Sequence, residues 1–314
     1  MQASRRAGQW LVVFSAIAFG WMPIFGSWAY QSGVNTQGLL LVRFTLAAAV
    51  MIAVMFWRGG RWPRGKVLLG LAAMGALGYV GQAYSYFSAL QYGSAALAAL
   101  LLYAYPVLVT LVAVIWGGER LGGRKLLALA LAAVSLILTI GPAGGQWLGV
   151  LLGLLAAAIY TGYILAGSRL TPQAGAMPAA TVVMSAAALA LWLTSAWQTP
   201  VWPGSHSGWL ALLAIALVST VGAILAFLAG LERLPATEAS MLSTLEPVVS
   251  VLLAAALLGD QLSGWQLLGG VGILISALLI ATAKPIPRVA TVELAAPESA
   301  RDPATLQPEA GRSA

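Results

Sequence analysis

Ten apolar stretches, each about as long as a bilayer is thick, occupy most of the chain before Lys284. A spanning helix needs about 20 predominantly apolar residues, and the connections between these stretches are short. Backbone groups in lipid must satisfy one another, which favours helices as the spanning elements. We therefore expect an all-α integral membrane protein with ten transmembrane helices. The stretches are 9–29, 37–57, 66–89, 94–116, 124–140, 147–166, 178–197, 208–230, 236–258 and 264–283.

The composition excludes a soluble fold and several kinds of chemistry. Of 314 residues, 60% are hydrophobic and 8% charged, whereas an average soluble domain has roughly 25% charged residues. The chain has no cysteine and one histidine, which rules out thiol catalysis and disulfides and argues against a zinc site. No Walker A loop is present, so ATP-driven export by this chain alone is not expected. We predict no metal and no cofactor.

The basic residues indicate how the chain is oriented. Of the 16 lysines and arginines, all but Arg43 fall on one side of a ten-helix arrangement. Basic loops face the cytoplasm, so we predict a multi-pass protein of the plasma (cell inner) membrane with both termini cytoplasmic. The net charge of +7 is then a topology signal, and no nucleic-acid partner is expected. The fifteen residues are Arg5, Arg6, Arg58, Arg61, Arg64, Lys66, Arg120, Arg124, Lys125, Arg169, Arg233, Lys284, Arg288, Arg301 and Arg312.

The first stretch also has features of a cleaved signal peptide. It follows a basic start, and Ser27-Trp28-Ala29 is a passable small-x-small site. Its apolar part is longer than a usual signal core, and it has a counterpart later in the chain. We therefore interpret it as the first transmembrane helix.

The chain aligns with itself without a gap at an offset of 141 residues, which indicates an internal repeat. Each half then holds five helices, and an odd number makes the second half enter from the opposite side, as in the inverted repeats of secondary transporters. The repeats are predicted at 1–145 and 146–284, followed by a disordered cytoplasmic tail at 285–314. The matches include Phe19 with Tyr160, Pro106-Val107 with Pro247-Val248, Gly118-Glu119 with Gly259-Asp260, and Ser135 with Ser276.

The penultimate and last stretches carry a family resemblance. The run LERLPATEASMLSTLEPVVSVLLAAALLGDQLSGWQLLGGVGILISALLI, from Leu231 to Ile280, resembles the EamA domain of the drug/metabolite transporter (DMT) superfamily. The first half repeats the pattern in ALQYGSAALAALLLYAYPVLVTLVAVIWGGERLGGRKLLALAL, and Leu41-Val42-Arg43-Phe44 matches the family's arginine in the second helix. The resemblance covers about residues 8 to 284. It implies a ten-helix carrier of small metabolites, commonly an exporter of amino acids and related compounds.

Two positions depart from that pattern. The second turn reads Gly259-Asp260-Gln261-Leu262 where the family commonly has Glu-Arg, and Arg43 has Met184 at the equivalent position of the second repeat. Neither departure threatens the fold, but both argue against copying a relative's mechanism. Glu119 and Asp260 are expected to cap the helices that follow them.

Two charged residues lie inside predicted helices. Glu246 precedes Pro247, which lacks an N–H and frees a carbonyl near Ser243. An ionised acid at that depth normally faces a cavity or a partner, so Glu246 is a candidate for substrate binding and for proton coupling, or a structural hydrogen-bonding group. Arg43 can hold a substrate carboxylate, pair with Glu246, or extend to the headgroups.

Aromatic residues and prolines complete the candidate site. Trp21, Tyr79, Tyr103 and Tyr160 are predicted to line a central cavity, where aromatic rings suit an aromatic or amphipathic solute. The prolines predicted to mark kinks, and to act as hinges in a carrier, are Pro23, Pro106 and Pro247.

The sequence therefore predicts a secondary transporter that exports small organic metabolites, first amino acids, by alternating access. A multidrug or amphipathic-cation exporter and a metabolite importer remain open, as does a membrane scaffold without transport activity. An enzyme is not expected, because no dyad or metal cluster is present. Proton coupling and facilitated diffusion both remain open, and so do a monomer and a homodimer.

Overall fold

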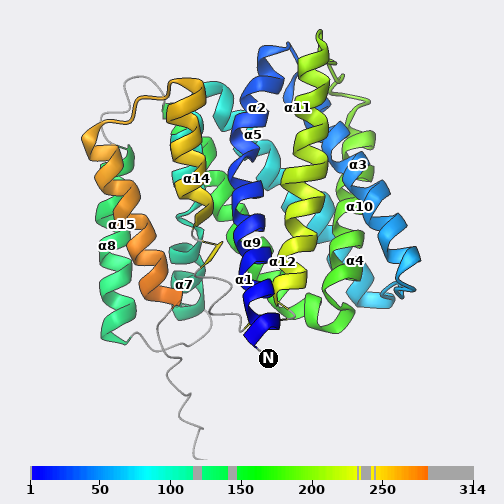
Figure 1. The fold of residues 1–314 in the computed structure, drawn as a ribbon, viewed down its shortest axis with the longest axis horizontal. Coiled ribbons are helices and arrows are strands. Elements are labelled where there is room, and N and C mark those ends of the chain that lie inside the picture. Colours follow the sequence, from blue (N-terminus) through cyan, green and yellow to red (C-terminus); the bar gives the residue numbers. More distant parts are fainter. Residues whose placement is uncertain are drawn as a thin grey trace, which may run out of the picture. The chain divides into compact units, whose positions relative to one another are not determined.

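The computed structural model describes residues 2–115, 122–140, 147–231, 233–234, 242–243 and 245–281. Every regular element in these ranges is helical, and they contain no strand. The helices stand side by side as a bundle (Figure 1). The predicted tail at 285–314 lies outside the described residues, as do Glu119, Glu232 and Glu238.

The first repeat makes five crossings, three of them built from more than one helical segment. The first crossing breaks at Trp21, the third contains a π-helical segment, and the fourth breaks at Tyr103–Ala104. The elements are α1 (Gln2–Gly20) with α2 (Met22–Gln31), α3 (Thr36–Trp57), α4 (Gly65–Ala73) with η1 (Met74–Tyr79) and α5 (Val80–Tyr92), α6 (Ala95–Leu102) with α7 (Tyr105–Ile115), and α8 (Gly123–Ile140).

The second repeat follows the same order. Its third crossing again contains a π-helical segment, η2, and its fourth ends in another, η3. Where the structure describes them, the predicted ends are correct to within a few residues, except that the first crossing begins already at Gln2 and the sixth runs on to Ala174. The elements are α9 (Trp147–Ala174), α10 (Ala176–Thr194), α11 (His206–Ala216) with η2 (Leu217–Gly222) and α12 (Ala223–Leu231), α14 (Leu245–Leu253) with η3 (Ala254–Leu258), and α15 (Gly264–Ala281).

The packing of the helices follows the symmetry of the two repeats. Equivalent helices pack on each other, α3 on α10 and α8 on α15, and the pair α1 with α12 has its counterpart in α5 with α9. A serine hydroxyl joins α15 to α8, since Ser276 Oγ donates to the Ala128 carbonyl at 2.7 Å. Because each repeat crosses five times, the second is inverted relative to the first. The predicted architecture of two inverted five-helix repeats is confirmed.

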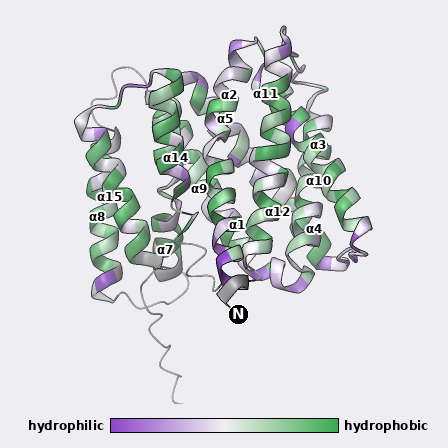
Figure 2. Cartoon of the chain, in the orientation of Figure 1, coloured by the Kyte–Doolittle hydropathy of each residue, from purple (hydrophilic) through white to green (hydrophobic). Residues whose placement is uncertain are grey.

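The surface of the bundle is that of a membrane protein. Apolar residues dominate the length of the helices, and hydrophilic residues gather near their ends (Figure 2). Large apolar side chains of these helices face outward, with Leu77 75%, Ile137 70% and Leu210 66% exposed. Seven helices are long and apolar enough to cross a bilayer, and three shorter apolar helices accompany them in the described ranges. The protein is therefore a multi-pass membrane protein.

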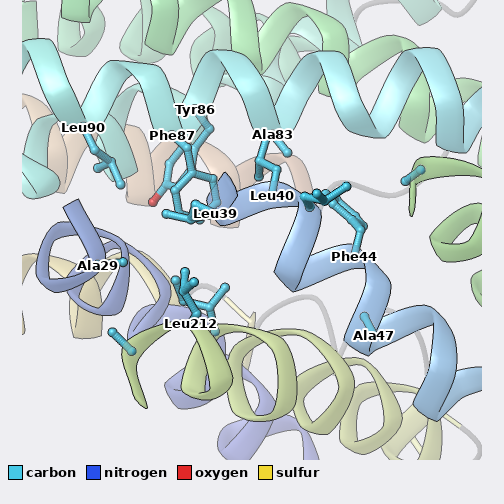
Figure 3. Packing of buried hydrophobic residues seen from close by; sticks show 14 of the residues in the cluster. Ala29, Leu39, Leu40, Phe44, Ala47, Ala83, Tyr86, Phe87, Leu90 and Leu212 are labelled. Carbon is cyan, nitrogen blue, oxygen red and sulfur yellow. The ribbon is translucent and has the colours of Figure 1, made fainter. Parts of the chain in front are cut away.

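A close-packed cluster fixes α3 against α5. Leu39, Leu40 and Phe44 of α3 point toward Ala83 and Phe87 of α5 (Figure 3). Phe44 and Phe87 are fully buried. The cluster holds α3 in one rotation about its axis, and that rotation determines where the neighbouring Arg43 points.

Candidate functional site

A cavity of about 100 Å³ lies between the repeats. Side chains from six of the crossings line it, and five of these side chains are tyrosines. The lining residues are Phe19, Met22, Arg43, Tyr79, Gln82, Ala83, Tyr86, Leu102, Tyr103, Tyr105, Tyr160 and Glu246.

Repeat-equivalent positions meet in this cavity. Phe19 and Tyr160, which align at the offset of 141 residues, both line it. So do Tyr105 and Glu246, each of which directly precedes a proline. Two pairs of equivalent positions therefore meet in the cavity, although ten of its twelve lining residues belong to the first half. Among these residues the second half contributes the acid and the first half the arginine.

Broken helices surround the cavity. α6 ends at Leu102 and α7 begins at Tyr105, so Tyr103 sits in the break. Non-helical backbone at membrane depth is tolerated where it is buried in protein or lines a cavity. Pro106 and Pro23 are the second residues of α7 and α2, directly after the two breaks. Pro247 lies in the first turn of α14. The predicted kinks at Pro23 and Pro106 thus coincide with breaks in their crossings. Residue 244, just before α14, lies outside the described residues, so the kink at Pro247 and the hinge role of all three prolines remain predictions.

Glu246 is joined to the other repeat through Tyr103. The Tyr103 hydroxyl donates to Glu246 Oε2 at 2.8 Å and also lies 3.3 Å from the Ser243 carbonyl oxygen. Pro247 has no N–H to offer that carbonyl. The hydroxyl that holds the acid thus also approaches the carbonyl to which the proline cannot donate.

Arg43 is buried, with 2% of its surface exposed. Its Nε donates to Thr220 Oγ1 at 2.9 Å, and its Nη2 donates to the Tyr79 hydroxyl at 3.1 Å. The guanidinium also lies 5.0 Å from the Phe44 ring centroid and 5.4 Å from that of Phe87. It therefore does not extend to the headgroups.

The two charges do not neutralise each other. In the described part of the chain, neither Arg43 nor Glu246 forms an ion pair, and each is held by neutral partners instead. Removing a charge from water costs several kcal/mol unless a partner compensates it. The cavity thus contains one basic and one acidic group that a bound ligand can complement.

A belt of tyrosine rings connects the two charged groups. Successive ring centroids are 5.9 Å apart for Tyr103 and Tyr105, 4.8 Å for Tyr105 and Tyr160, and 5.8 Å for Tyr160 and Tyr163. Tyr163 and Tyr79 are 5.5 Å apart. The belt begins at the hydroxyl that holds Glu246 and ends at the hydroxyl that holds Arg43.

Five of the six residues predicted for the site line this one cavity: Arg43, Tyr79, Tyr103, Tyr160 and Glu246. Trp21 is not among the lining residues. Its ring stacks on Phe25 of the same crossing, with centroids 5.1 Å apart, because side chains four residues apart lie on one face of a helix.

Sequence reasoning missed Gln82 and Thr220. A glutamine inside an apolar stretch was an available signal for Gln82. A buried threonine gives no such signal, because threonine hydroxyls commonly bond within their own helix. Thr220 was identifiable only as the repeat equivalent of Tyr79, 141 positions later.

Asp260 caps a different helix from the one expected. Its Oδ2 accepts from the backbone N–H of Ala96, in the first turn of α6 in the other repeat, at 3.1 Å. α15 begins instead with a reciprocal pair, in which Ser263 N donates to Gln266 Oε1 at 2.9 Å and Gln266 N to Ser263 Oγ at 3.2 Å. The expectation that Asp260 caps its following helix was therefore wrong.

Two inverted five-crossing repeats around a polar cavity define the architecture of a secondary transporter. The chain belongs to the EamA-like transporter family, which matches residues 6–141 and 147–282. The two matched segments begin 141 residues apart, the offset at which the sequence aligns with itself. The predicted family is confirmed.

Individual relatives agree with this membership. The uncharacterized transporter YcbK of Bacillus subtilis is 26% identical, over 85% of this chain and 90% of its own. The uncharacterized inner membrane transporter YedA of Escherichia coli is 28% identical, over 88% and 92%. The aromatic amino acid exporter YddG of Ancylobacter novellus is 26% identical, over 79% and 88%. A solved crystal structure superposes with a TM-score of 0.62 at 25% identity, over 87% of this chain and 96% of the other.

Proposed function

We propose that the protein is a secondary carrier that exports amino acids, aromatic ones first, by alternating access through the central cavity. The observation that carries the proposal is the presence of Arg43 and Glu246 on one cavity, with no ion pair to either in the described residues. An α-amino acid offers a carboxylate to Arg43 and an ammonium to Glu246. Guanidinium binds carboxylate in a bidentate manner, and a carboxylate binds ammonium with charge-assisted hydrogen bonds.

The tyrosine belt supports an aromatic substrate. Stacked and edge-to-face ring pairs contribute about 0.5–1.5 kcal/mol beyond burial. Tyr160 and Tyr163 already stack at an interplanar angle of 15°, and a substrate ring can extend such a stack. The export of aromatic amino acids by the relative from Ancylobacter novellus is consistent with this choice.

The cavity must widen during transport. At about 100 Å³ it is smaller than the roughly 300–1,000 Å³ of typical ligand pockets, so we expect binding to require the repeats to separate on one side. The breaks at Trp21 and Tyr103–Ala104 are the places where the regular helix of a crossing is interrupted, and we expect the crossings to bend there. The proposal also includes three further expectations: both termini are cytoplasmic, the protein lies in the inner membrane, and transport is coupled to protons through Glu246.

A second candidate is an exporter of amphipathic cations. Glu246 together with the tyrosines is a suitable site for a lipophilic cation, through charge and cation–π attraction. That reading gives Arg43 no ligand, which is why the amino acid is preferred. Direction follows the gradients, so import by the same site is a further alternative.

Counterflow in proteoliposomes tests the proposal. Vesicles loaded with unlabelled phenylalanine should accumulate labelled phenylalanine, and competition by phenethylamine or 3-phenylpropanoate should be weaker, because each lacks one charged group. Exchange of a lipophilic cation instead of phenylalanine would favour the second candidate. No exchange of any probe by correctly folded protein would contradict transport of these classes and would reopen the scaffold interpretation.

A further inference from the structure

Thr220 and Tyr79 are repeat equivalents, and both bind Arg43. They align at the offset of 141 residues, and each lies in the π-helical segment of its repeat, Tyr79 in η1 and Thr220 in η2. One guanidinium therefore connects the third crossing of both halves. The contact between Arg43 and Thr220 joins residues 177 positions apart, and a threonine at position 220 does not by itself predict it.

The two hydroxyls occupy one edge of the guanidinium. Nε and Nη2 carry the hydrogens of the same edge, and these are the atoms that donate to Thr220 and Tyr79. The opposite edge, formed by Nη1 and the second hydrogen of Nη2, has no hydrogen-bond partner in the described part of the chain. Guanidinium donors have a fixed fork geometry, so filling one edge determines where the other points.

The orientation of Thr220 is itself fixed. Its hydroxyl proton is donated to the Ile215 carbonyl at 2.9 Å, five residues back in the π-helical turn. The oxygen therefore presents a lone pair to Arg43, and the side chain is fully buried. A hydroxyl held in this way is a positioning group for the arginine.

We propose that Thr220 and Tyr79 are the positioning residues that aim the open edge of Arg43 at a substrate carboxylate, and so determine selectivity for carboxylate-bearing solutes. The inference rests on the proposed function, because it takes Arg43 to be the carboxylate site. Since Thr220 belongs to the second repeat and Arg43 to the first, the carboxylate site is complete only when both repeats hold the arginine together.

Binding to the purified full-length protein tests this apart from transport. The probes are 3-phenylpropanoate, which keeps the carboxylate, and phenethylamine, which lacks it; their Kd values are measured by ligand-induced thermal stabilisation. Thr220→Val removes the acceptor at nearly constant volume, whereas Thr220→Ser keeps it. Thr181→Val is the matched control, because Thr181 is also fully buried, and within the described residues its hydroxyl bonds only to the Met177 carbonyl of its own helix.

We expect Thr220→Val to weaken 3-phenylpropanoate binding about tenfold, the size of effect of a hydrogen bond to a charged group. Phenethylamine binding should be unchanged, and Thr220→Ser and Thr181→Val should resemble the wild type. Tyr79→Phe should shift carboxylate binding in the same direction, and it carries the test if Thr220→Val does not fold. Equal loss for both probes, failure of Thr220→Ser to restore binding, or no carboxylate binding by the wild type would overturn the inference.

The two proposals can fail separately. Thr220-dependent binding of 3-phenylpropanoate without phenylalanine exchange in vesicles would leave the inference standing and remove the proposed function. Phenylalanine exchange with an unchanged KM in Thr220→Val would leave the proposed function standing and overturn the inference. In a transporting wild type, we expect Thr220→Val to raise the KM for phenylalanine and to change the maximal rate less.

Discussion

The hydroxyl of Tyr103, in the break of the fourth crossing, donates to the carboxylate of Glu246 in the equivalent crossing of the other repeat, at 2.8 Å. The bond spans the cavity wall where the two halves meet. Movement of one half relative to the other must lengthen or break it, since its two partners belong to different repeats. A change in the charge of Glu246 therefore alters a bond between the repeats, and a movement of the repeats alters the surroundings of Glu246.

Glu246→Gln should abolish the pH dependence of substrate affinity. The amide keeps an oxygen that accepts from Tyr103, but it cannot bind or release a proton. In the wild type, protonation of Glu246 removes the charge that holds an ammonium, so apparent affinity for phenylalanine should fall as pH is lowered. Measurement of counterflow KM at several pH values tests this. An unchanged pH dependence in Glu246→Gln would exclude the residue from coupling.

Asp260→Ala should destabilise the protein by about 1 kcal/mol, the usual loss when a helix N-terminus loses its side-chain acceptor. The free N–H belongs to Ala96, so the effect should appear as a lower thermal midpoint in detergent. Asp260→Asn retains an acceptor oxygen and should lose less. Equal midpoints for all three proteins would show that water replaces the contact.

Gly75→Ala should disrupt the packing of η1 on α10. A Cβ at Gly75 would overlap the backbone carbonyl of Val183, which has little freedom to move. Overpacking typically costs about 1–3 kcal/mol, so the yield of monodisperse protein should fall. Gly78→Ala is the control three residues later, since its nearest contact would be an ordinary 3.5 Å to Tyr163. Similar behaviour of both variants would contradict the close approach.

A cysteine at position 83 should react with a membrane-impermeant thiol reagent from either side of the membrane. Ala83 lines the cavity, and the chain has no other cysteine to react. Access from alternate sides is the signature of a carrier. Ala47→Cys is the protected control, because Ala47 belongs to the same packed cluster as Ala83 but is not among the residues that line the cavity. Protection of position 83 from both sides would favour a scaffold.

A fluorescent protein fused to the C-terminus should fold and fluoresce, whereas an alkaline phosphatase fusion should be inactive. The prediction follows from the basic residues, which lie on the side of both termini. A fusion at Gly204, between α10 and α11, should give the opposite pair of results. The reverse pattern would place the termini outside the cell and invert the proposed direction.

The crossings were predictable because the signal for them is local. A run of about twenty apolar residues is long enough to span a bilayer regardless of the rest of the chain. The residues at which α8 and α15 begin, Gly123 and Gly264, follow directly from that pattern. Intramembrane charges are rare enough that Arg43 and Glu246 were recognisable as candidates. The repeat then paired Tyr105 with Glu246 and Phe19 with Tyr160 from spacing alone.

The details of the site were not predictable, because lipid and protein interior are equally apolar. An amphipathic helix reveals its buried face through its polar face, but a transmembrane helix such as α3 is apolar all round, so its sequence does not say which residues face inward. Trp21 was expected in the cavity for this reason and instead stacks on Phe25.

The sequence by itself determined that the chain lies in lipid, that it makes ten crossings in an inverted repeat, and which family it belongs to. It could do so because hydropathy, helix length and residue spacing are properties of short segments. The tertiary structure alone decided that Thr220 holds Arg43, that Asp260 caps α6, and that five tyrosines join the two charges. Those contacts depend on how each helix is rotated and where it bends. Rotation and bending are set by packing between residues far apart in the chain, as in the pairing of Arg43 with Thr220.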